Sequence, residues 1–252
     1  MTDQKLNSGI AVVTGAAGGM GQFIVRQLHA AGNRVVLADI DEEKSQALAT
    51  ELSSDGTTAR VIYLDVSRRQ SFVDALSEIT QEWGTPTILV NNAAVTRAAD
   101  LMTLGEEDFN KVLTTNVDSI FFGCQVIGGA MAEAGYGRII NMASLAGQNG
   151  GTATGGHYAA SKGAIMTTTK IFARELADRG VTVNSISPGP HDLPIVHETV
   201  PAEKLAGVIA GIPVKKLGNP AFIAKAVALL ADEDASFVTG ACWDINGGLY
   251  LR

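Results

Sequence analysis

Thr14-Gly-Ala-Ala-Gly-Gly-Met-Gly21 is the stretch that decides the fold of this 252-residue chain. It follows a short run of strand-forming residues, Ile10–Thr14, and opens a helical pattern over Met20–Ala31. A tight glycine turn between a strand and a helix leaves backbone N–H groups and the helix N-terminus pointing outward, which suits a pyrophosphate. Glycine also lets the helix pack close to the sheet. The stretch therefore predicts a phosphate-binding strand–turn–helix unit.

The same alternation of short apolar runs and longer helical patterns continues along the whole chain. Val35-Val-Leu37 and Ile88-Leu-Val90 are unbroken apolar runs, as expected for strands that are buried on both faces. Strands that are followed by helices of this length imply right-handed crossovers and a parallel sheet covered on both sides. No linker or repeat divides the chain, so we expect one α/β domain over residues 1–252, doubly wound, with a mostly parallel sheet of about seven strands. The expected strands are Ile10–Thr14, Arg34–Ala38, Arg60–Leu64, Thr87–Asn91, Arg138–Met142, Val181–Ile186 and Ala241–Ile245, and the expected helices are Met20–Ala31, Glu42–Leu52, Gln70–Trp83, Glu106–Ala132, His157–Ala177 and Pro220–Leu230.

One segment, Pro188–Gly218, breaks this rhythm. It holds five of the seven prolines of the chain. Such punctuation after the sixth strand favours a binding loop over a core element. We therefore expect a substrate lid at about 188–218, in which His191 and His197 either touch substrate or are solvated polar groups.

Composition excludes several classes of partner. The chain has 19 Lys and Arg against 26 Asp and Glu, a formal charge of −7, which argues against nucleic acid and anionic membranes as partners. Its two cysteines, Cys124 and Cys242, have no metal-ligand spacing, so we expect no metal. No apolar run is long enough for a membrane span, and no signal-peptide pattern precedes the first strand. A cytoplasmic protein is expected.

Asp39 ends the second expected strand, 18 residues after Gly21. A carboxylate in this place accepts hydrogen bonds from both hydroxyls of an adenosine ribose and repels a 2′-phosphate. No Arg or Lys occurs in the glycine turn or beside Asp39 to neutralise such a phosphate, so the sequence favours NAD over NADP. The alternative is that Asp39 caps the next helix together with Asp41.

Tyr158 and Lys162 stand four residues apart, with Ser144 fourteen residues upstream. On a helix, side chains at this spacing share one face. A free tyrosine has a pKa of about 10, and a neighbouring cation lowers the pKa and makes the phenol a usable base. A serine hydroxyl close by could hold a substrate oxygen. The pattern predicts proton transfer on an alcohol oxygen, although a solvated lysine beside a half-buried tyrosine gives the same spacing.

The glycine turn, Asp39 and this tyrosine–lysine pair together resemble the short-chain dehydrogenase/reductase family, and the match runs through nearly the whole chain. The resemblance implies a Rossmann fold and an NAD-dependent oxidoreductase that interconverts a small-molecule secondary alcohol and a ketone by hydride transfer. Further matching elements are Asp65-Val66, which contacts adenine in the family, Asn91-Asn-Ala-Ala94, with Ala94 in place of the usual glycine, Asn116 in Thr115-Asn-Val-Asp-Ser119, and the turn Pro188-Gly189. Implied cofactor contacts are Gly15, Ala17, Gly19, Met20, Gly21, Asp39, Ile40, Asp65, Val66, Asn92, Ala93, Ala94, Tyr158, Lys162, Pro188 and Gly189.

The resemblance also implies a role for each of four catalytic residues. Tyr158 would be the general acid/base, and Lys162 would lower the tyrosine pKa and hydrogen-bond the nicotinamide ribose. Ser144 would orient the substrate oxygen, and Asn116 would hold a water that links Lys162 to solvent. The chain departs from the family at Leu193, which stands where a Thr often binds the nicotinamide carboxamide.

Two other functions stay open at this point. A 3-oxoacyl-[acyl-carrier-protein] reductase must dock an acidic carrier, for which Arg138 and Arg179 are available, but Glu133 stands where a basic cluster would help. Such reductases also commonly use NADPH. A non-catalytic dinucleotide-sensing protein would not require the four catalytic residues. The family further implies a homotetramer, assembled through the long helices after the fourth and fifth strands and through the C-terminal segment.

Overall fold

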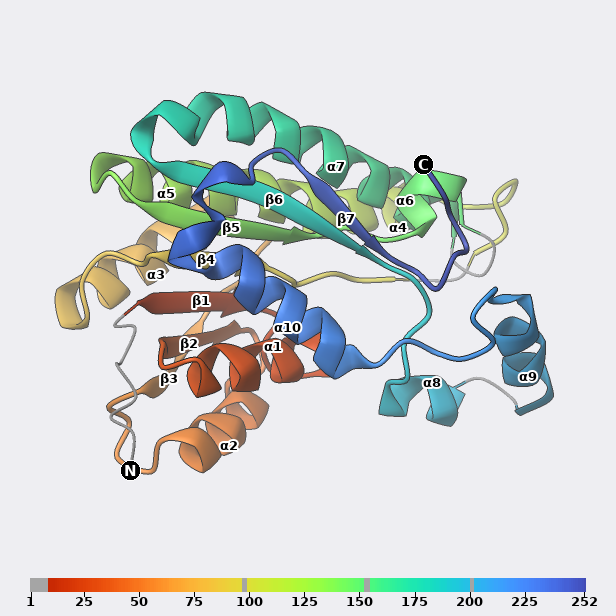
Figure 1. The fold of residues 1–252 in the computed structure, drawn as a ribbon, viewed down its shortest axis with the longest axis horizontal. Coiled ribbons are helices and arrows are strands. Elements are labelled where there is room, and N and C mark those ends of the chain that lie inside the picture. The colour runs from red at the N-terminus through yellow and green to blue at the C-terminus, as the bar shows by residue number, and fades with distance from the viewer. Residues whose placement is uncertain (1–8, 97–98, 152–154, 200–201) are drawn as a thin grey trace.

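A computed structural model describes residues 9–96, 99–151, 155–199 and 202–252. All seven strands are parallel and lie in the order β3-β2-β1-β4-β5-β6-β7 (Figure 1). The first strand, β1, lies inside the sheet. The next two strands are added on one side of it and the remaining four on the other, so the strand order reverses between β1 and β4, which confirms the expected doubly wound Rossmann fold. The strands are β1 (Ile10–Thr14), β2 (Arg34–Asp39), β3 (Ala59–Tyr63), β4 (Ile88–Asn91), β5 (Gly137–Met142), β6 (Val181–Pro188) and β7 (Cys242–Ile245).

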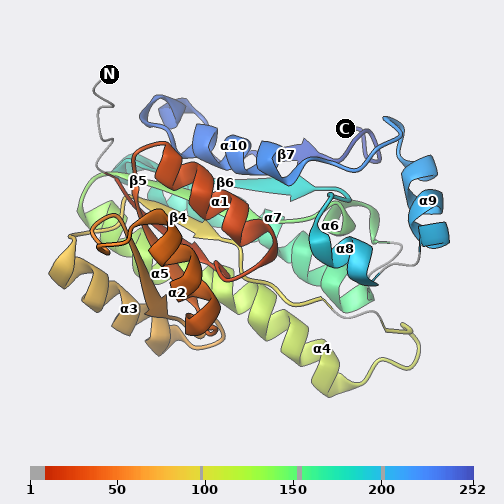
Figure 2. The same ribbon diagram turned by 90° about the horizontal axis from the view of Figure 1, so that it is seen from below.

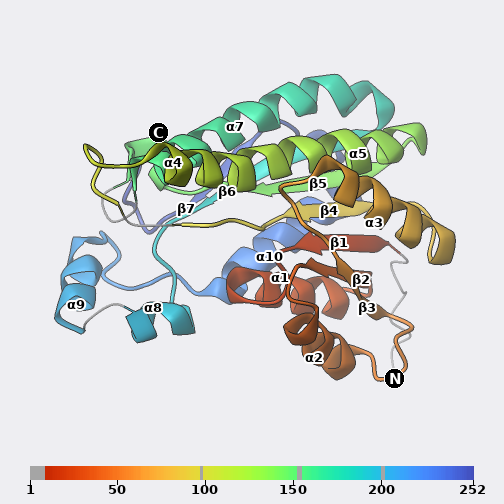
Figure 3. The same ribbon diagram turned by 180° about the vertical axis from the view of Figure 1, so that it is seen from behind.

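Helices cover both faces of the sheet, as Figures 1 and 3 show from opposite sides. One face packs against α3, α5 and α7, and the other packs against α1, α2 and α10. The helices are α1 (Gly19–Ala30), α2 (Glu42–Leu52), α3 (Arg69–Glu82), α4 (Glu106–Leu113), α5 (Ser119–Glu133), α6 (Ala146–Asn149), α7 (Gly156–Leu176), α8 (Pro194–Thr199), α9 (Ala202–Gly211) and α10 (Pro220–Ala231), with 3-10 turns at Ala177–Arg179 and Glu233–Phe237.

The two hydrophobic cores follow from strand geometry. Successive side chains of a strand point to opposite faces of the sheet. In β1, Ile10 and Val12 therefore enter the core under α5 and α7, while Ala11 and Val13 enter the core under α1 and α10. Every residue of β1 is buried, as the unbroken apolar run predicts for a central parallel strand.

One predicted helix differs from the structure. The expected continuous helix over Glu106–Ala132 is wrong, because a π-helical segment, Thr114–Asp118, separates α4 from α5. Asn116 lies inside this segment, is fully buried, and bonds the backbone of Val95 through its side chain. An i→i+5 turn of this kind is rare and occurs mostly at functional sites. Its cause is a tertiary contact, which the helical periodicity does not reveal.

The segment 189–218, where a lid was expected, carries α8 and α9 beyond the carboxyl ends of the strands (Figures 1 and 2). Its two arms meet at a narrow neck. There the Gly218 N–H donates to the Pro190 carbonyl at 2.9 Å, and the Asp192 N–H donates to the Gly218 carbonyl at 2.8 Å. No residue of α9 is buried. Residues 200 and 201 of the expected lid lie outside the described residues.

The glycine turn carries a specific steric constraint, which predicts the effect of one substitution. A Cβ on Gly21 would lie 2.1 Å from the carbonyl oxygen of Gly15, so the backbone itself must move. We expect Gly21→Ala to lower the free energy of unfolding by about 1–3 kcal/mol in a urea titration. Gly129→Ala is the matched control, since a Cβ there meets nothing within 4 Å and alanine favours the helix. Equal stability of the two variants would contradict the packing argument.

Candidate active site

The glycine turn presents the start of α1 to solvent. Gly18 is the N-cap of α1 and supplies no side-chain acceptor for the first N–H groups of the helix. A Cβ on Gly18 or Gly19 would meet nothing within 4 Å, so open space lies in front of these groups. Gly19 also has a positive φ of 52°, which lets the turn curl toward that space. The residues present therefore fit the phosphates of a dinucleotide.

Asp39 is held against this turn at the end of β2. One carboxylate oxygen accepts from the N–H of Ala17 at 2.8 Å, and the other accepts from the N–H of Asp41 at 3.0 Å. Each oxygen keeps acceptor capacity for a further donor such as a ribose hydroxyl. Asp41, rather than Asp39, caps α2, since its side chain accepts from the Lys44 N–H. The ammonium of Lys44 is itself paired with Asp41 at 2.6 Å.

The loop after β4 packs onto the same turn. The side-chain amide of Asn92 donates to the carbonyls of Thr14 and Gly15, each at 3.0 Å. A Cβ on Gly15 would lie 2.8 Å from the Cα of Ala93, so only glycine permits this approach. Asn92 was expected to contact the cofactor, and in the structure its side chain holds the glycine turn, for which the same contact is expected.

The remaining predicted cofactor residues lie at the same carboxyl edge of the sheet. Asp65 follows β3, and its Oδ1 accepts from the N–H and hydroxyl of Ser67, which fixes its orientation. Ile40 follows β2 with 66% of its surface exposed, as an apolar surface for a base requires. At the end of β6, a Cβ on Gly189 would lie 2.8 Å from the Cα of Asn246, so the Pro188-Gly189 turn needs its glycine.

Tyr158, Ser144 and Lys162 meet at the N-terminal end of α7. The hydroxyl of Ser144, which follows β5, lies close enough to the phenol of Tyr158 to lower its pKa. The Lys162 ammonium lies 5.6 Å from the centroid of the tyrosine ring. It is buried and donates to the carbonyl of Met142, the last residue of β5, at 2.7 Å. The structure thus brings together three of the four residues predicted to be catalytic.

The direction of the tyrosine pKa differs from the prediction. Burial raises the pKa of Tyr158, and the hydrogen bond with Ser144 lowers it by less. The expected net lowering of the Tyr158 pKa is wrong for this structure, because the loss of water, which disfavours the phenolate, is the largest cause of the shift. The pKa of the Lys162 ammonium is itself lowered to about 8 by desolvation. The phenol of Tyr158 is therefore protonated at neutral pH and suited to donate a proton.

Asn116, the fourth predicted catalytic residue, ties two parts of the site together. Its side chain accepts from the Val95 N–H at 2.8 Å and donates to the Val95 carbonyl at 2.9 Å. It also donates at 3.0 Å to the hydroxyl of Ser161, the neighbour of Lys162. Asn116 therefore fixes α7 against the loop after β4, and its expected role in holding a water stays a prediction.

A buried row of hydrogen bonds between side chains of β4, β5 and α7 was not predicted from the sequence. Asn91 donates to the Oδ1 of Asn141 at 2.9 Å, and Asn141 donates to the hydroxyl of Thr169 at 3.0 Å. All three side chains are buried. A single Asn inside the apolar run Ile139-Ile-Asn-Met142 is the signal that points to such a row, since a buried amide needs partners.

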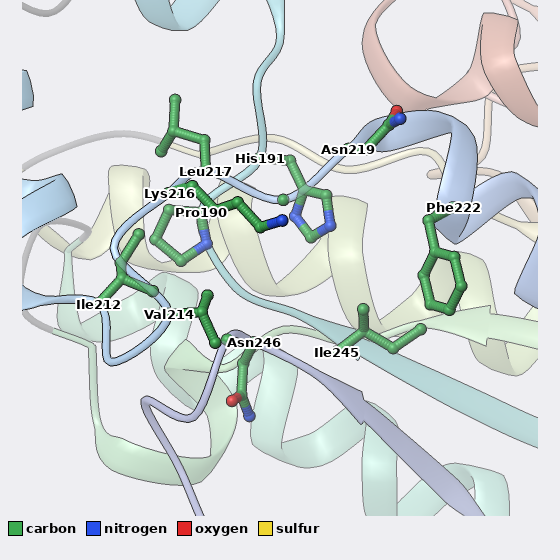
Figure 4. A pocket seen from close by; sticks show the side chains of 12 residues that line it. Pro190, His191, Ile212, Val214, Lys216, Leu217, Asn219, Phe222, Ile245 and Asn246 are labelled. Atoms are coloured by element: carbon green, nitrogen blue, oxygen red, sulfur yellow. The ribbon is translucent and has the colours of Figure 1, made fainter.

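The neck of the segment 189–218 borders a cavity of about 390 Å³ (Figure 4). His191 lines it but is only 6% exposed, and its Nδ1 bonds the Gly189 carbonyl at 2.7 Å. The interpretation of His191 as a solvated polar group is wrong, because its ring packs against Gly218, where a Cβ would lie 2.6 Å from Nε2, while contact with substrate stays a prediction. Burial lowers its pKa. His197 is exposed and pairs with Asp192 at 2.5 Å.

Arg138 is not available to a charged partner. It is 3% exposed and donates to the backbone carbonyls of Gly137, Asp232 and Glu233, so it joins the start of β5 to the end of α10. In the part of the chain that the structure describes, no three His, Cys, Asp or Glu side chains gather as a metal site. Within the same residues, no helix is long and apolar enough to cross a membrane.

Comparison with known proteins agrees with this geometry. Residues 15–250 match the family model described as enoyl-(acyl carrier protein) reductase. The chain is 36% identical over 244 residues to the 3-oxoacyl-[acyl-carrier-protein] reductase FabG of Escherichia coli, covering 96% of this chain and 97% of that protein. The chain belongs to the short-chain dehydrogenase/reductase family. The FabG proteins of Vibrio cholerae and Pseudomonas aeruginosa are 37% and 35% identical to it over 247 residues, with 98% of this chain and 99% of each relative covered.

Membership of this family makes the chain an oxidoreductase that acts on CH–OH or keto groups with a nicotinamide dinucleotide. The catalytic roles expected for Asn116, Ser144, Tyr158 and Lys162 stay predictions. The residues expected to bind the dinucleotide, from the start of α1 to the Pro188-Gly189 turn, lie along the carboxyl ends of the strands, which we call the cofactor edge.

The buried ammonium of Lys162 predicts a pH-dependent stability. Its pKa is about 8 in the folded chain and near 10.5 when unfolded, so the unfolded state binds more protons between these values. The stability of the wild type should therefore rise relative to Lys162→Met as the pH rises from 8 to 10.5, by at most about 3 kcal/mol. Urea titrations across this range measure the gap.

Lys170→Met removes an exposed lysine from the same helix and serves as the control for this titration. It should keep the pH dependence of the wild type. If the difference in free energy of unfolding between the wild type and Lys162→Met does not change with pH, the pKa of Lys162 is not lowered in the folded chain, contrary to the effect expected from its burial.

Proposed function

We propose that the chain reduces a ketone to a secondary alcohol, and runs the reverse oxidation less readily at neutral pH. The observation that carries this is the placement of the Tyr158 phenol close to the Ser144 hydroxyl, with the buried Lys162 ammonium 5.6 Å from its ring centroid. A protonated acid beside an oxygen-binding hydroxyl is what reduction of a carbonyl requires. The family match limits the chemistry to CH–OH and keto groups.

In this proposal the chain's own residues manage the oxygen atom of the substrate. The hydroxyl of Ser144 hydrogen-bonds the carbonyl oxygen, and the phenol of Tyr158 gives that oxygen its proton as the C–O bond becomes an alcohol. The charged form of Lys162 stabilises the phenolate that remains. A bound nicotinamide supplies the hydride to the carbonyl carbon.

We also propose NAD as the preferred cofactor. Asp39 supports this choice, because its carboxylate is fixed by Ala17 beside the glycine turn and repels a 2′-phosphate. Lys44 lies close enough for Asp39 to raise its pKa, but the ammonium is already paired with Asp41, the first cause of that shift.

A 3-oxoacyl thioester is the second candidate substrate. The names of the relatives from Escherichia coli and Vibrio cholerae favour it. The cations first considered for an acidic carrier do not, since Arg138 is buried and Arg179 lies 3.9 Å from Glu175. These two residues therefore give no support to a docked acidic protein over a ketone or thioester free of its carrier.

We further propose that the segment 189–218 is a lid over the substrate and that the chain forms a homotetramer. The helix α9 supports the first proposal, because it is mostly apolar and has no buried residue, so a bound substrate could cover its apolar side chains. Exposed apolar side chains on the outer helices support the second, since an interface between copies of the chain would bury them. They include Phe121 on α5, Ile171 on α7, and Phe222 and Leu229 on α10.

Tyr158→Phe tests the proposed proton donor. We expect turnover of ketones to fall about a thousandfold, because a general acid contributes this order of rate, while binding of NADH stays largely unchanged. Steady-state assays with simple ketones and with acetoacetyl-CoA, each with NADH and NADPH, measure the effect and identify the substrate class. Tyr136→Phe, at an exposed tyrosine near the start of β5, is the control.

Three outcomes of this screen bear on the proposal. Near-normal activity of Tyr158→Phe would refute Tyr158 as the proton donor. Cofactor binding by the wild type without turnover of any ketone or thioester would favour the dinucleotide-sensing alternative. Preference for acetoacetyl-CoA would select the second candidate substrate.

Asp39→Asn tests the cofactor. Loss of the charge weakens the hydrogen bonds to a ribose and removes the repulsion of a 2′-phosphate, so the ratio of kcat/KM for NADH over NADPH should fall about tenfold or more. Asp74→Asn removes an exposed carboxylate on α3, which among the described residues accepts only from the Gln70 side chain four residues earlier, and should leave the ratio unchanged. A wild type that prefers NADPH would overturn the choice of NAD.

A further inference from the structure

A line of polar contacts joins the C-terminal end of the described chain to the loop that holds Ser144. Arg252 donates from Nε to one oxygen of Asp244 at 2.6 Å and from Nη2 to the other at 3.1 Å. Asp244, on β7, also accepts from the side-chain amide of Gln148 at 2.5 Å. The Oε1 of Gln148 accepts from the hydroxyl of Ser187 at 2.8 Å. Figure 1 shows the C-terminal end beside α6, which carries Gln148.

The orientation of the Gln148 amide follows from its partners. An ionised carboxylate only accepts hydrogen bonds, so the NH₂ group must face Asp244. The amide oxygen then faces Ser187, whose hydroxyl can donate. Both ends of the amide are occupied, so α6 is tied to β7 on one side and to β6 on the other.

The Asp244 carboxylate is suited to this place. It is 19% exposed, so its pair with Arg252 is less screened than a fully exposed ion pair. Burial alone raises the pKa of Asp244, but hydrogen bonds from Arg252 and Gln148 outweigh it and lower the pKa. The group is therefore ionised at neutral pH and holds both donors.

The short helix α6 acts directly on Ser144. The N–H of Ala146, its first residue, donates to the Ser144 hydroxyl oxygen at 3.1 Å. Backbone bonds on either side of Ser144, from Ala143 to Ile186 and from Leu145 to Pro188, hold the loop against β6. A rotation of α6 moves the donor that orients the Ser144 hydroxyl, whereas these two backbone bonds only fix the loop.

We propose that Gln148, Asp244 and Arg252 are positioning residues, which hold α6 so that the Ser144 hydroxyl meets both Tyr158 and the substrate oxygen. This inference rests on the proposed role of Ser144 in ketone reduction. Catalysis is sensitive to such placement, since a misplacement of 1 Å costs about a hundredfold in rate. None of the three residues needs to contact substrate or cofactor to have this effect.

Single substitutions measure the effect on turnover. We expect Gln148→Met and Arg252→Met each to lower kcat for ketone reduction about tenfold, while KM for the cofactor changes less than about twofold, because the cofactor edge is untouched. Arg179→Met is the matched control, since it removes an exposed arginine that faces an acid elsewhere on the surface. It should leave both constants unchanged.

A double substitution separates positioning from general support of the fold. If the contacts act through the Ser144 hydroxyl, Gln148→Met should cost nothing further in a Ser144→Ala background. A purely structural role predicts that the two losses multiply, and that result would overturn the proposal.

A reciprocal pair tests the link between α6 and β7. Gln148→Glu places two carboxylates in contact and should lower kcat more than Gln148→Met. Adding Asp244→Asn gives this carboxylate an amide N–H donor as its partner and should recover most of the lost kcat. No recovery would exclude the Gln148–Asp244 contact as the cause.

Backbone hydrogen exchange tests the placement of α6 without any assay of turnover. Arg252→Met and Gln148→Met should speed exchange at Leu145, Ala146 and Gly147, whose N–H groups are bonded in and around this loop, and Arg179→Met should not. Unchanged exchange would overturn the inference even if no substrate is turned over. Faster exchange in the variants would support the positioning of α6 even if the wild type turned over no substrate. In that case only the proposed function would be refuted.

Discussion

The hydrogen bond from the buried Lys162 ammonium to the Met142 carbonyl docks α7 onto the end of β5, and the site depends on this contact. It brings Tyr158, one turn earlier on α7, beside Ser144, two residues after Met142. The Asn141–Thr169 bond repeats the tie further along the same pair of elements. An ammonium is expensive to bury, so its retention there indicates a use beyond packing.

The fold was predictable because its signals are local. A buried parallel strand has an unbroken apolar run in the sequence. In the turn Gly15–Gly21, glycine stands at both positions where a Cβ would collide with neighbouring backbone, Gly15 and Gly21. The π-helical segment around Asn116 has no such signal, because it arises from contacts with Val95 and Ser161, which are distant in sequence. The same holds for α6, whose four residues are anchored by β6 and β7 rather than by helical periodicity.

In the site, the sequence predicted which side chains lie close together but not the direction of their pKa shifts. A spacing of four residues on a helix was enough to place Lys162 near Tyr158. The sign of the pKa shift depends on how much water each group loses, and no spacing encodes that. His191 makes the same point, since a histidine in a proline-rich segment reads as exposed and is in fact buried under Gly218.

Selectivity for substrate has to come from outside the motif-bearing residues. In the proposed function, the glycine turn, Asp39 and the edge residues bind a cofactor, and Tyr158, Ser144 and Lys162 act on an oxygen that every ketone has. What remains to distinguish one ketone from another is the segment 189–218 and the loop that runs from Ser144 to α7. The segment closes on itself at the Pro190–Gly218 neck, and the loop is joined to β7 by the Gln148 amide. Substrate preference can therefore change through these two contacts while the cofactor edge and the proton donor stay where the sheet puts them.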